Sequence, residues 1–316
     1  MPNSLERNPP NGGRPSTNPQ TPWSAATVRD VSAPLLAIDG PSLLYRAFYA
    51  LPDSIRDKSG RPVNALLGTT NLVLQEIERH EPRAVVLCFG AEAAEYRVEL
   101  HSGYHADRPE VPDDLQPQWD LVPEFFGGFG WHVEMHETLE ADDLLGSYAK
   151  LETEAGGRAL LLTGDRDMFQ CASQDVTVLY LSTGVRGATE VGPDDVRERY
   201  GIPPELVPDF IALRGDPSDG IPGAKGVGAK TAADLLREHG SLETVLENAI
   251  GITRPALRKN LLGAADELVA YKDMATLRDA GVERPPDTPT DWAGGAAAAE
   301  ALGMNRLAER LRQKLA

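Results

Sequence analysis

Six acidic residues stand in three short stretches of the chain, LLAID, LEADD and TGDRD, and their side chains suit metal binding. They are Asp39, Glu140, Asp142, Asp143, Asp165 and Asp167. If the fold brings them together, they cannot all stay ionised at neutral pH without compensating cations or raised pKa values. Oxygen ligands select hard cations, so the cluster predicts Mg²⁺ or Mn²⁺ rather than Zn²⁺. Such sites hold ions about 3.5–4 Å apart that assist displacement at a phosphorus atom.

Each stretch also has a simpler interpretation. Acidic side chains near a helix N-terminus are stabilised by about 0.3–1 kcal/mol each, and LEADD directly precedes an apolar helical pattern. Asp39 precedes a glycine, as a turn residue would, and Asp165 follows Thr-Gly, which suits a helix cap. The metal interpretation gains weight only if the three stretches meet, and that depends on the elements that carry them.

The elements predicted around these stretches form a parallel sheet covered by helices. From residue 34, short apolar runs alternate with amphipathic stretches, which is typical of an α/β fold. The predicted strands are APLLAIDG, RAVVLCFG, WHVEMHE, RALLLTGD and VTVLYLS, and the predicted helices cover residues 42–51, 64–80 and 140–155. In open parallel sheets, ligands bind beyond the carboxyl ends of the strands. The six carboxylates are therefore predicted to meet at that edge.

The chain changes character near residue 203, where short helical segments punctuated by glycine begin and predict an all-helical second part. Its stretch GDPSDGIPGAKGVGAKTAADLL adds Asp216 and Asp219. The glycines that follow lead into a helix, and backbone N–H groups at such a helix start can hold a phosphate. The stretch fails the P-loop pattern GxxxxGK[ST] because Ala229 stands where the lysine is required. We interpret it as a helix-hairpin-helix, which binds a duplex backbone without reading its sequence.

Composition narrows the class of function. The 316 residues include 31 Lys and Arg against 48 Asp and Glu, a net charge of −17, which argues against a broad basic surface for nucleic acid. Binding of a polyanionic partner then needs a local source of positive charge, which bound divalent cations can supply. Cys88 and Cys171 lie in apolar segments and are expected to be reduced, buried thiols.

The sequence shows no sign of a membrane or secretory segment. No apolar run is long enough to span a membrane, and the N-terminus lacks the apolar core of a secretory signal, so we expect a cytoplasmic monomer without membrane contact. Residues 1–33 are rich in Pro, Asn, Ser and Thr without apolar periodicity and are expected to be disordered.

Five ordered motifs resemble those of the bacterial flap endonuclease, or 5′-3′ exonuclease, family, which includes the N-terminal 5′-nuclease domain of bacterial DNA polymerase I. They are IDGPSLLYRAF, EYRVELHSGYHADRPEVPDDL, LEADDLLG, TGDRDMFQ and GDPSDGIPGAKGVGAKTA, and the resemblance runs from about residue 35 to about residue 277. It implies an α/β fold of PIN-like (resolvase-like) type, with a parallel-rich sheet, flanking helices and a helical arch, followed by an all-helical helix-hairpin-helix (H3TH) domain. The implied divisions are a nuclease domain at 34–200, with its arch at about 91–122, and a DNA-binding domain with C-terminal helices at 201–316. No polymerase domain follows, so the resemblance implies a free-standing member.

The resemblance also implies roles for the acidic residues. The family's catalytic carboxylates correspond to Asp39, Glu140, Asp142, Asp165 and Asp167. The predicted ligands of one to three divalent ions include these five and also Asp143, Asp216 and Asp219. The family's hairpin binds a monovalent cation as well, which implies K⁺ near residues 223–228.

Residues that contact DNA are implied in the same way. Tyr45 matches a residue that stacks on a base beside the scissile phosphate, and Arg46 follows it, although a buried Tyr45 fits the sequence alone equally well. The arch segment at 91–122 corresponds to the passage for a 5′ single strand in the family. The remaining predicted contacts are Arg97, His105 and Arg108 in the arch, and Gly223, Gly226, Gly228 and Lys230 in the hairpin. The two arch arginines also fit a solvated surface.

Two positions depart from the family pattern. The second strand ends in FGA where the family usually has FDA, so Gly90 supplies no carboxylate. His105 stands where the arch commonly has a lysine, and a histidine stabilises a phosphate less well at neutral pH. We predict retained activity with an altered metal preference or occupancy.

These observations together predict a structure-specific 5′-flap endonuclease and 5′-3′ exonuclease. It would hydrolyse branched or 5′-ended DNA with Mg²⁺ or Mn²⁺, in replication or repair. Two alternatives stay open. One is a flap-DNA-binding protein that has lost its chemistry, motivated by Gly90 and His105. The other is an RNA-directed nuclease on the same carboxylate core, against which the hairpin motif argues.

Overall fold

A six-stranded sheet forms the framework of the chain. The computed structural model describes residues 33–106, 108–183 and 187–315, so the predicted tail at 1–33 lies outside the described residues except for its last position. The strand order is β3-β2-β1-β4-β5-β6, and all neighbours are parallel except β5 and β6. The strands are β1 (Leu35–Asp39), β2 (Ala84–Phe89), β3 (His132–Met135), β4 (Ala159–Thr163), β5 (Val176–Tyr180) and β6 (Thr189–Val191). The five predicted strands are confirmed.

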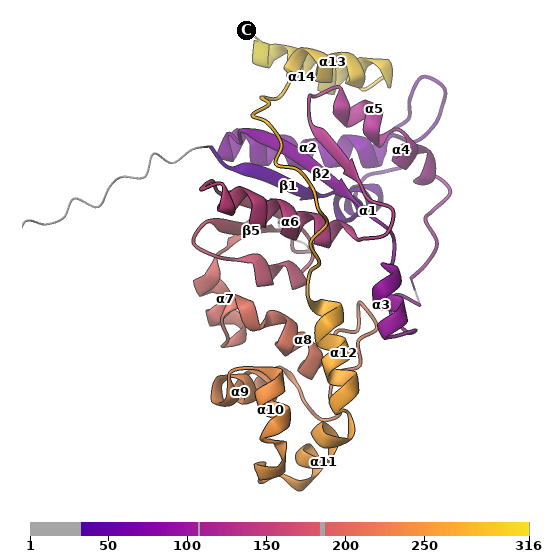
Figure 1. Cartoon of the computed structure of the whole chain (residues 1–316). Coiled ribbons are helices and arrows are strands. Elements are labelled where there is room, and N and C mark those ends of the chain that lie inside the picture. Colours follow the sequence, from indigo (N-terminus) through magenta and orange to yellow (C-terminus); the bar gives the residue numbers. More distant parts are fainter. Residues whose placement is uncertain (1–32, 107, 184–186, 316) are drawn as a thin grey trace, which may run out of the picture. The chain divides into compact units, whose positions relative to one another are not determined.

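Helices surround the sheet and then continue as a helical second part (Figure 1). Along the first part lie α1 (Gly40–Ala50), α2 (Asn64–His80), α3 (Glu95–Leu100), α4 (Gln116–Asp120), α5 (Val122–Gly127), α6 (Ala141–Glu154), the 3₁₀ helix η1 (Asp167–Cys171) and α7 (Pro193–Tyr200). After them come η2 (Pro204–Leu206), α8 (Val207–Arg214), α9 (Ala229–His239), α10 (Leu242–Glu247), η3 (Ala249–Gly251), α11 (Pro255–Gly263), α12 (Ala265–Ala275), α13 (Trp292–Ala301), α14 (Asn305–Arg312) and η4 (Gln313–Leu315).

Both faces of the sheet are buried, which explains the continuous apolar runs of the strands. Successive strand side chains point to opposite faces. In β1, Leu35 and Ala37 therefore join a core that includes residues of α6 and α8, whereas Leu36 and Ile38 join a second core that includes residues of α2 and α5. With both faces covered, the carboxyl edge of the sheet is the place left for a site.

Two helices start at that edge with acidic caps. Asp39 is the last residue of β1 and also the N-cap of α1, where its side chain accepts a hydrogen bond from the Ser42 N–H at 3.0 Å. Glu140 caps α6 in a capping box with Asp143. The simpler interpretation of LEADD as a helix start is thus correct, and Asp39, expected as a turn residue, caps a helix; both places put the carboxylates where the metal interpretation needs them.

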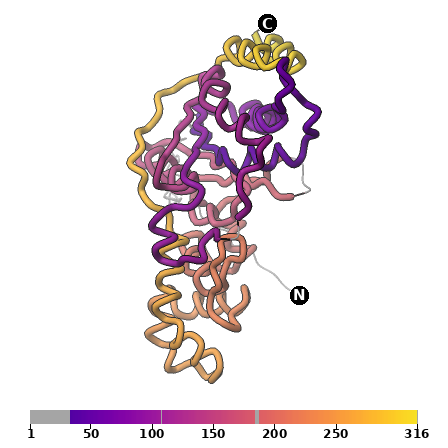
Figure 2. Tube along the Cα trace, turned by 90° about the vertical axis from the view of Figure 1, so that its right-hand side faces the viewer, coloured from indigo at the N-terminus to yellow at the C-terminus, as the bar shows by residue number. Residues whose placement is uncertain are grey.

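The last two helices return to the sheet. Figures 1 and 2 show residues 276–291 running from α12 back along the sheet to α13. The Asp291 N–H donates to the Phe129 carbonyl at 2.8 Å, and Ala299 and Leu307 belong to the core shared with α2 and α5. The predicted division at residues 200 and 201 stays a prediction, but it separates α13 and α14 from the core on which they pack.

Three local features differ from the expectations. The short β6 carried no recognisable sequence signal, since three residues show too little periodicity. Residues 256–277, within the part predicted to be all-helical, form two helices, α11 and α12, with a break at Ala264 that the sequence did not indicate. The arch segment at 91–122 is helical only near its ends, in α3 and in α4, with α5 beginning at its last residue. Across the described ranges, no helix is long and apolar enough to cross a membrane.

Candidate metal centre

A pocket of about 460 Å³ opens at the carboxyl edge of the sheet. The strands β1 and β4 are parallel neighbours, so the residues that follow them meet at the same edge. The acidic residues that line the pocket are Asp39, Glu92, Glu140, Asp142 and Asp165, and the aromatic ones are Tyr45, Tyr49 and Trp119. The structure therefore brings together residues from all three acidic stretches.

Asp39 is held in place by hydrogen bonds from two elements. Its side chain is 6% exposed and accepts hydrogen bonds from the Ser42 N–H and from the Thr163 hydroxyl, the latter at 2.7 Å. Burial raises the pKa of Asp39, and these hydrogen bonds act in the opposite direction. Thr163, the last residue of β4, therefore orients an acidic group on the neighbouring strand, a role that its sequence context did not reveal.

Asp142, Asp165 and Asp167 form a group with strongly perturbed ionisation. The pKa of Asp165 is raised to about 7, mainly by burial and next by the charge of Asp219. Burial and the charge of Asp165 raise the pKa values of Asp142 and Asp167 well above the usual range. Among the described residues, none of the three forms an ion pair, so their mutual repulsion is left for a cation to relieve.

Asp216 and Asp219 approach this group from the loop after α8. Their charges contribute to the raised pKa values of Asp165 and Asp167. Asp216 pairs with Arg214 at 2.8 Å, and its backbone exchanges hydrogen bonds with Ile221, which closes the loop. The helical second part therefore adds negative charge to the same centre, as predicted, but Asp216 already has a cationic partner.

Glu140 is held by donors from the arch segment. Its Oε1 accepts from the Ala94 N–H at 2.7 Å and lies 3.1 Å from Arg97, and its Oε2 accepts from the Tyr104 hydroxyl at 2.9 Å. Burial and the charge of Glu140 raise the pKa of Tyr104, which keeps the phenol a donor. Each carboxylate oxygen has a further lone pair, so Glu140 can still face the pocket while the arch segment fixes it.

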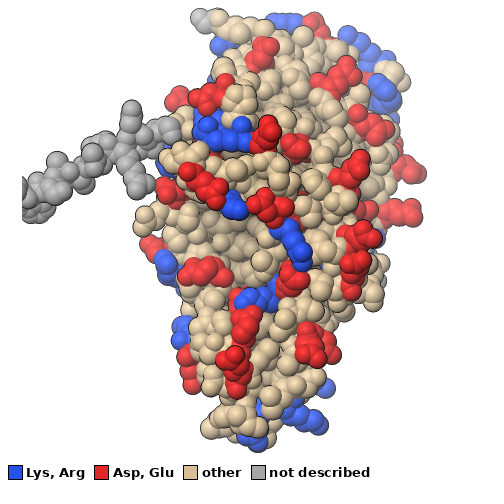
Figure 3. Space-filling view, viewed as in Figure 1, with Lys and Arg blue, Asp and Glu red and all other residues tan. Residues whose placement is uncertain are grey.

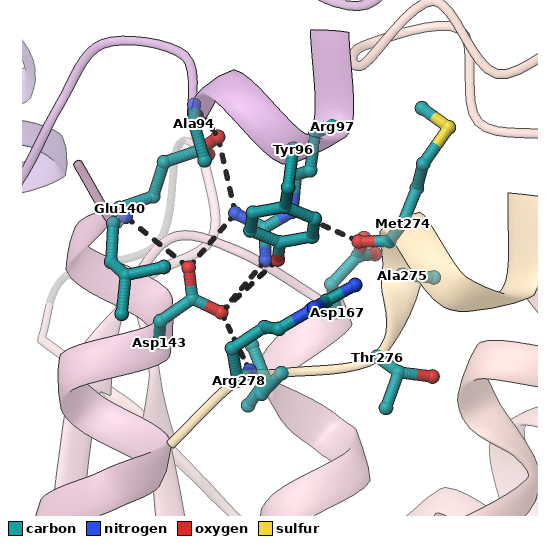
Figure 4. Close-up of polar contacts among 12 residues, drawn as sticks. Ala94, Tyr96, Arg97, Glu140, Asp143, Asp167, Met274, Ala275, Thr276 and Arg278 are labelled. Carbon is teal, nitrogen blue, oxygen red and sulfur yellow. Dashed lines mark hydrogen bonds and ion pairs between the residues drawn. The ribbon is translucent and has the colours of Figure 1, made fainter. Parts of the chain in front are cut away.

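Asp143, in the first turn of α6, and Arg97, in α3, form a buried pair (Figure 4). Asp143 has no exposed surface, and its oxygens lie 3.0 and 3.1 Å from the two terminal nitrogens of Arg97. The Arg278 N–H donates to Asp143 at 2.8 Å, and Arg97 donates to the Met274 carbonyl at 2.9 Å. Although burial acts to lower the pKa of Arg97, the neighbouring carboxylates raise it.

This burial argues against two of the predicted roles. Asp143 uses its oxygens for Arg97 and for backbone N–H groups, so it does not present them as metal ligands. Arg97 is 3% exposed and points away from solvent, so it does not contact DNA in this structure. The pair instead joins α3, α6 and the segment after α12 (Figure 4).

The remaining donor set fits a hard divalent cation. It consists of carboxylate oxygens only, at an edge where burial and then the charges of neighbouring carboxylates raise the pKa values of Asp142, Asp165 and Asp167. Within the described part of the chain, no group of three or more His, Cys, Asp or Glu side chains is arranged so that it could hold a metal ion. Mg²⁺ keeps several waters and usually takes only one or two carboxylates, so an open arrangement suits it.

The aromatic wall of the pocket adds residues that the sequence interpretation missed. Tyr45 lies edge-on to Trp119 with ring centroids 6.2 Å apart, and it lines the pocket; its stacking on a base stays a prediction. Tyr49, one helical turn later, is 71% exposed. The i, i+4 spacing of the two tyrosines on α1 was a signal for a shared face, whereas Trp119 comes from α4 and only the fold brings it here.

The predicted basic contacts differ in accessibility. Arg108 is exposed at the rim of the pocket and donates to the Glu92 carbonyl at 3.3 Å. Arg46 points toward the end of β5 and donates to the carbonyls of Leu181 and Ser182, so it is already engaged. His105 has a side chain only 4% exposed, 3.2 Å from Asp219, and does not face a DNA site. Figure 3 shows basic and acidic side chains interspersed on the face in view, without a basic stripe.

The glycine-rich loop folds tightly between α8 and α9. Gly223 has φ +67°, and a Cβ there would lie 2.3 Å from the Gly215 nitrogen, so only glycine fits. Gly226 has φ +81°, and Gly228 is the N-cap of α9. No described heavy atom lies within 4 Å of a Cβ built on Gly228, so the first turn of α9 is accessible. Lys230 in this turn is exposed and pairs with Asp234 at 2.9 Å.

Close packing at the end of β2 requires a glycine at position 90. A Cβ at this position would lie 2.3 Å from the Leu139 carbonyl oxygen and 2.6 Å from the Glu140 Cα. The adjacent Ala91 N–H donates to the same carbonyl at 2.8 Å, which draws the end of β2 against the start of α6. The absent carboxylate therefore coincides with a close backbone contact that an aspartate would disrupt.

The fold and the site define a class before any comparison: a resolvase-like α/β domain with an acidic centre at its carboxyl edge, joined to a helical domain with a glycine-rich hairpin. Two family models match the chain in this order, the 5′-3′ exonuclease N-terminal resolvase-like domain at residues 34–201 and the 5′-3′ exonuclease C-terminal SAM fold at residues 202–289. The chain belongs to the 5′-3′ exonuclease family. The predicted family, fold class and class of enzyme are confirmed.

Known relatives agree with this assignment. A 5′-3′ exonuclease of Mycobacterium tuberculosis is 37% identical over 283 residues, which cover 82% of this chain and 88% of that protein. DNA polymerase I of the same species is 38% identical over 271 residues, which cover 84% of this chain but only 30% of the polymerase. The chain thus matches less than a third of the polymerase length.

Solved structures support the fold. A flap endonuclease of bacteriophage T5, in a complex with DNA and metal ions, has a TM-score of 0.64 at 16% identity, covering 88% of this chain and 98% of that one. The catalytic core of Rad2 in complex with DNA substrate has a TM-score of 0.58 at 16% identity, covering 88% and 92%. At such low identity the likeness shows a common fold.

Proposed function

We propose that the protein is a structure-specific 5′ nuclease that hydrolyses phosphodiester bonds in branched or 5′-ended DNA with Mg²⁺ or Mn²⁺. The observation that carries this proposal is the group of Asp142, Asp165 and Asp167 at one edge of the sheet, whose pKa values are raised by burial and by the charges of neighbouring carboxylates. Family membership supports the reaction class. The T5 and Rad2 structures, described as complexes with DNA, support the substrate class.

The proposed metal ligands are a subset of the predicted ones. Asp39, Glu140, Asp142, Asp165 and Asp167 are assigned to the catalytic ions, with Asp219 and Asp216 beside them. Asp143 is assigned instead to holding Arg97 and the start of α6. When bound, the divalent ions supply an activated water and stabilise the attacking and leaving oxygens.

The pocket walls are proposed to orient the DNA strand. Tyr45 offers a ring face or edge to an unpaired base next to the carboxylates, and Arg108 at the rim offers a charge to a phosphate. Base stacking on an aromatic side chain contributes about 1–3 kcal/mol. The accessible first turn of α9, after Gly228, is proposed to hold a duplex phosphate, with K⁺ at residues 223–228. A monomeric state and a cytoplasmic location stay predictions.

Cleavage of a 5′-labelled flap DNA tests the proposal. Wild type should cut near the flap junction with Mg²⁺ or Mn²⁺ and not with EDTA. Asp165→Asn should lose the activity, whereas Asp194→Asn, a substitution at a fully solvated carboxylate, should retain it. Tight flap binding without cutting under any metal would support the binding-only alternative, and faster cutting of a matched RNA flap would support the RNA-directed one.

A further inference from the structure

Tyr104 and His105, at the centre of the arch segment, contact carboxylates on two different parts of the chain. Their rings stack with centroids 3.9 Å apart and an interplanar angle of 22°. The Tyr104 hydroxyl donates to Glu140 at the start of α6, and the His105 Nε2 lies 3.2 Å from Asp219 in the loop after α8. The stacked pair therefore connects the two groups of acidic residues that form the candidate metal centre.

The position of His105 is specified by several independent contacts. Its Nδ1 lies 3.0 Å from the Glu92 carbonyl oxygen, so both ring nitrogens have partners. Its backbone is left-handed, with φ +51°, and its N–H points to the Asp219 carbonyl at 3.4 Å. A side chain only 4% exposed, with both nitrogens engaged, has no freedom to reach a phosphate.

The loop that carries Asp219 is shaped to receive this part of the arch segment. Gly220 has φ +73°, and a Cβ there would lie 2.5 Å from the Gly103 carbonyl oxygen. Only a glycine allows the two loops to approach so closely. The contact is thus formed by backbone on both sides, with the ring of His105 beside it.

We propose that His105 is a positioning residue for the metal centre, which orients the Asp219 carboxylate while Tyr104, stacked on it, orients Glu140. The inference rests on the proposed function, because it assigns both carboxylates to the metal centre. Hydrogen-bonded partners of metal ligands fix their orientation, and removing such a partner typically lowers metal affinity about 10- to 100-fold. A flexible lysine at this position would bring a point charge without a fixed ring to stack. The fixed ring of His105, stacked on Tyr104, instead contacts Asp219 and orders the acidic residues.

Calorimetric titration of the DNA-free, full-length protein with Mn²⁺ tests the inference without relying on activity. His105→Ala should weaken Mn²⁺ binding about tenfold. His105→Gln should recover most of the loss, since its terminal amide can donate to Asp219. His101→Ala is the matched control, because His101 lies in the same segment but contacts the Tyr271 ring, and it should bind Mn²⁺ as wild type does.

A second background shows whether His105 acts through Asp219. In Asp219→Asn protein, His105→Ala should produce no further loss of Mn²⁺ affinity. Flap affinity measured in EDTA should change less than twofold in His105→Ala. The inference is overturned if Mn²⁺ binding is unchanged in His105→Ala, if the loss persists in the Asp219→Asn background, or if His105→Ala weakens flap binding instead. If the wild-type protein neither binds Mn²⁺ nor cuts flap DNA, the proposed function itself is refuted. This result is distinguishable from a failure of the inference about His105 alone.

Discussion

Replacing Arg97 by alanine is expected to destabilise the protein by several kcal/mol. The guanidinium is buried among Asp143, Glu140 and the Met274 carbonyl, and it joins three elements that are distant in the sequence. Its removal leaves two carboxylates in the interior without their cation. Removing one partner of a buried ion pair typically costs about 3–5 kcal/mol, because the other charge stays buried and unpaired.

The structure places the expected loss toward the lower end of that range. Asp143 keeps hydrogen bonds from the N–H groups of Glu140 and Arg278, and Glu140 keeps those from Ala94 and Tyr104. These donors partly stabilise the two buried carboxylates that have lost their cation, so we expect a loss of about 3 kcal/mol. Arg97→Lys retains one charge but not the two-pronged geometry and should lose less.

Equilibrium urea unfolding measures this difference from the shift of the midpoint at constant slope. Arg197→Ala is the control, since Arg197 forms a solvated pair with Asp194 and its loss should change stability by less than about 0.5 kcal/mol. In the double variant Arg97→Ala, Asp143→Asn, the loss should be smaller than the sum of the two single losses. A loss in Arg97→Ala no larger than in the control would refute the assignment of this pair as a structural connection.

Three further predictions concern the pocket. Because the pKa of Asp165 is raised from 3.8 to about 7, the folded metal-free protein binds more protons than the unfolded chain between about pH 4 and pH 7, so its melting temperature should fall as pH rises through this window. Asp165→Asn should flatten this dependence. A melting temperature that falls with pH as steeply as in wild type would contradict the assignment of this effect to Asp165. Gly90→Asp and Gly90→Ala should each lose about 1–3 kcal/mol in urea unfolding, because the added Cβ meets the Leu139 carbonyl; wild-type stability in either variant would show that the end of β2 can move. Tyr45→Leu should weaken flap binding by about 1–3 kcal/mol with little change in melting temperature, and the reverse result would assign Tyr45 to the core.

Much of the framework followed from local patterns. The apolar runs of β1 and β4 are long enough to predict strands, and the acidic residues directly after them were therefore predicted at one edge. The motif resemblance extended this to the family and the order of its parts. The strand β6 and the break at Ala264 escaped prediction because short elements are decided by contacts rather than by periodicity.

The roles of individual charged residues could not be assigned from the same patterns. By residue type and motif, Arg97 was predicted to contact DNA and Asp143 to bind a metal. The two side chains instead pair with each other, although they lie 46 positions apart in the sequence. His105 was expected near a phosphate, and the fold turns it toward Asp219. Gly90 read as a missing ligand, whereas the structure shows a contact with the Leu139 carbonyl that leaves no room for a side chain.

The sequence by itself determined the sheet and the edge at which the acidic residues gather, and it predicted a site for a hard cation there, because strand periodicity and side-chain type are properties of short segments. Only the tertiary structure decided which carboxylates remain available for a cation. Asp143 is neutralised by Arg97, whereas burial and the charge of Asp165 raise the pKa of Asp142, and burial and the charge of Asp219 raise that of Asp165. Which carboxylates are paired and which are left for a cation depends on distances between residues far apart in the chain, since charge pairing and burial act through space.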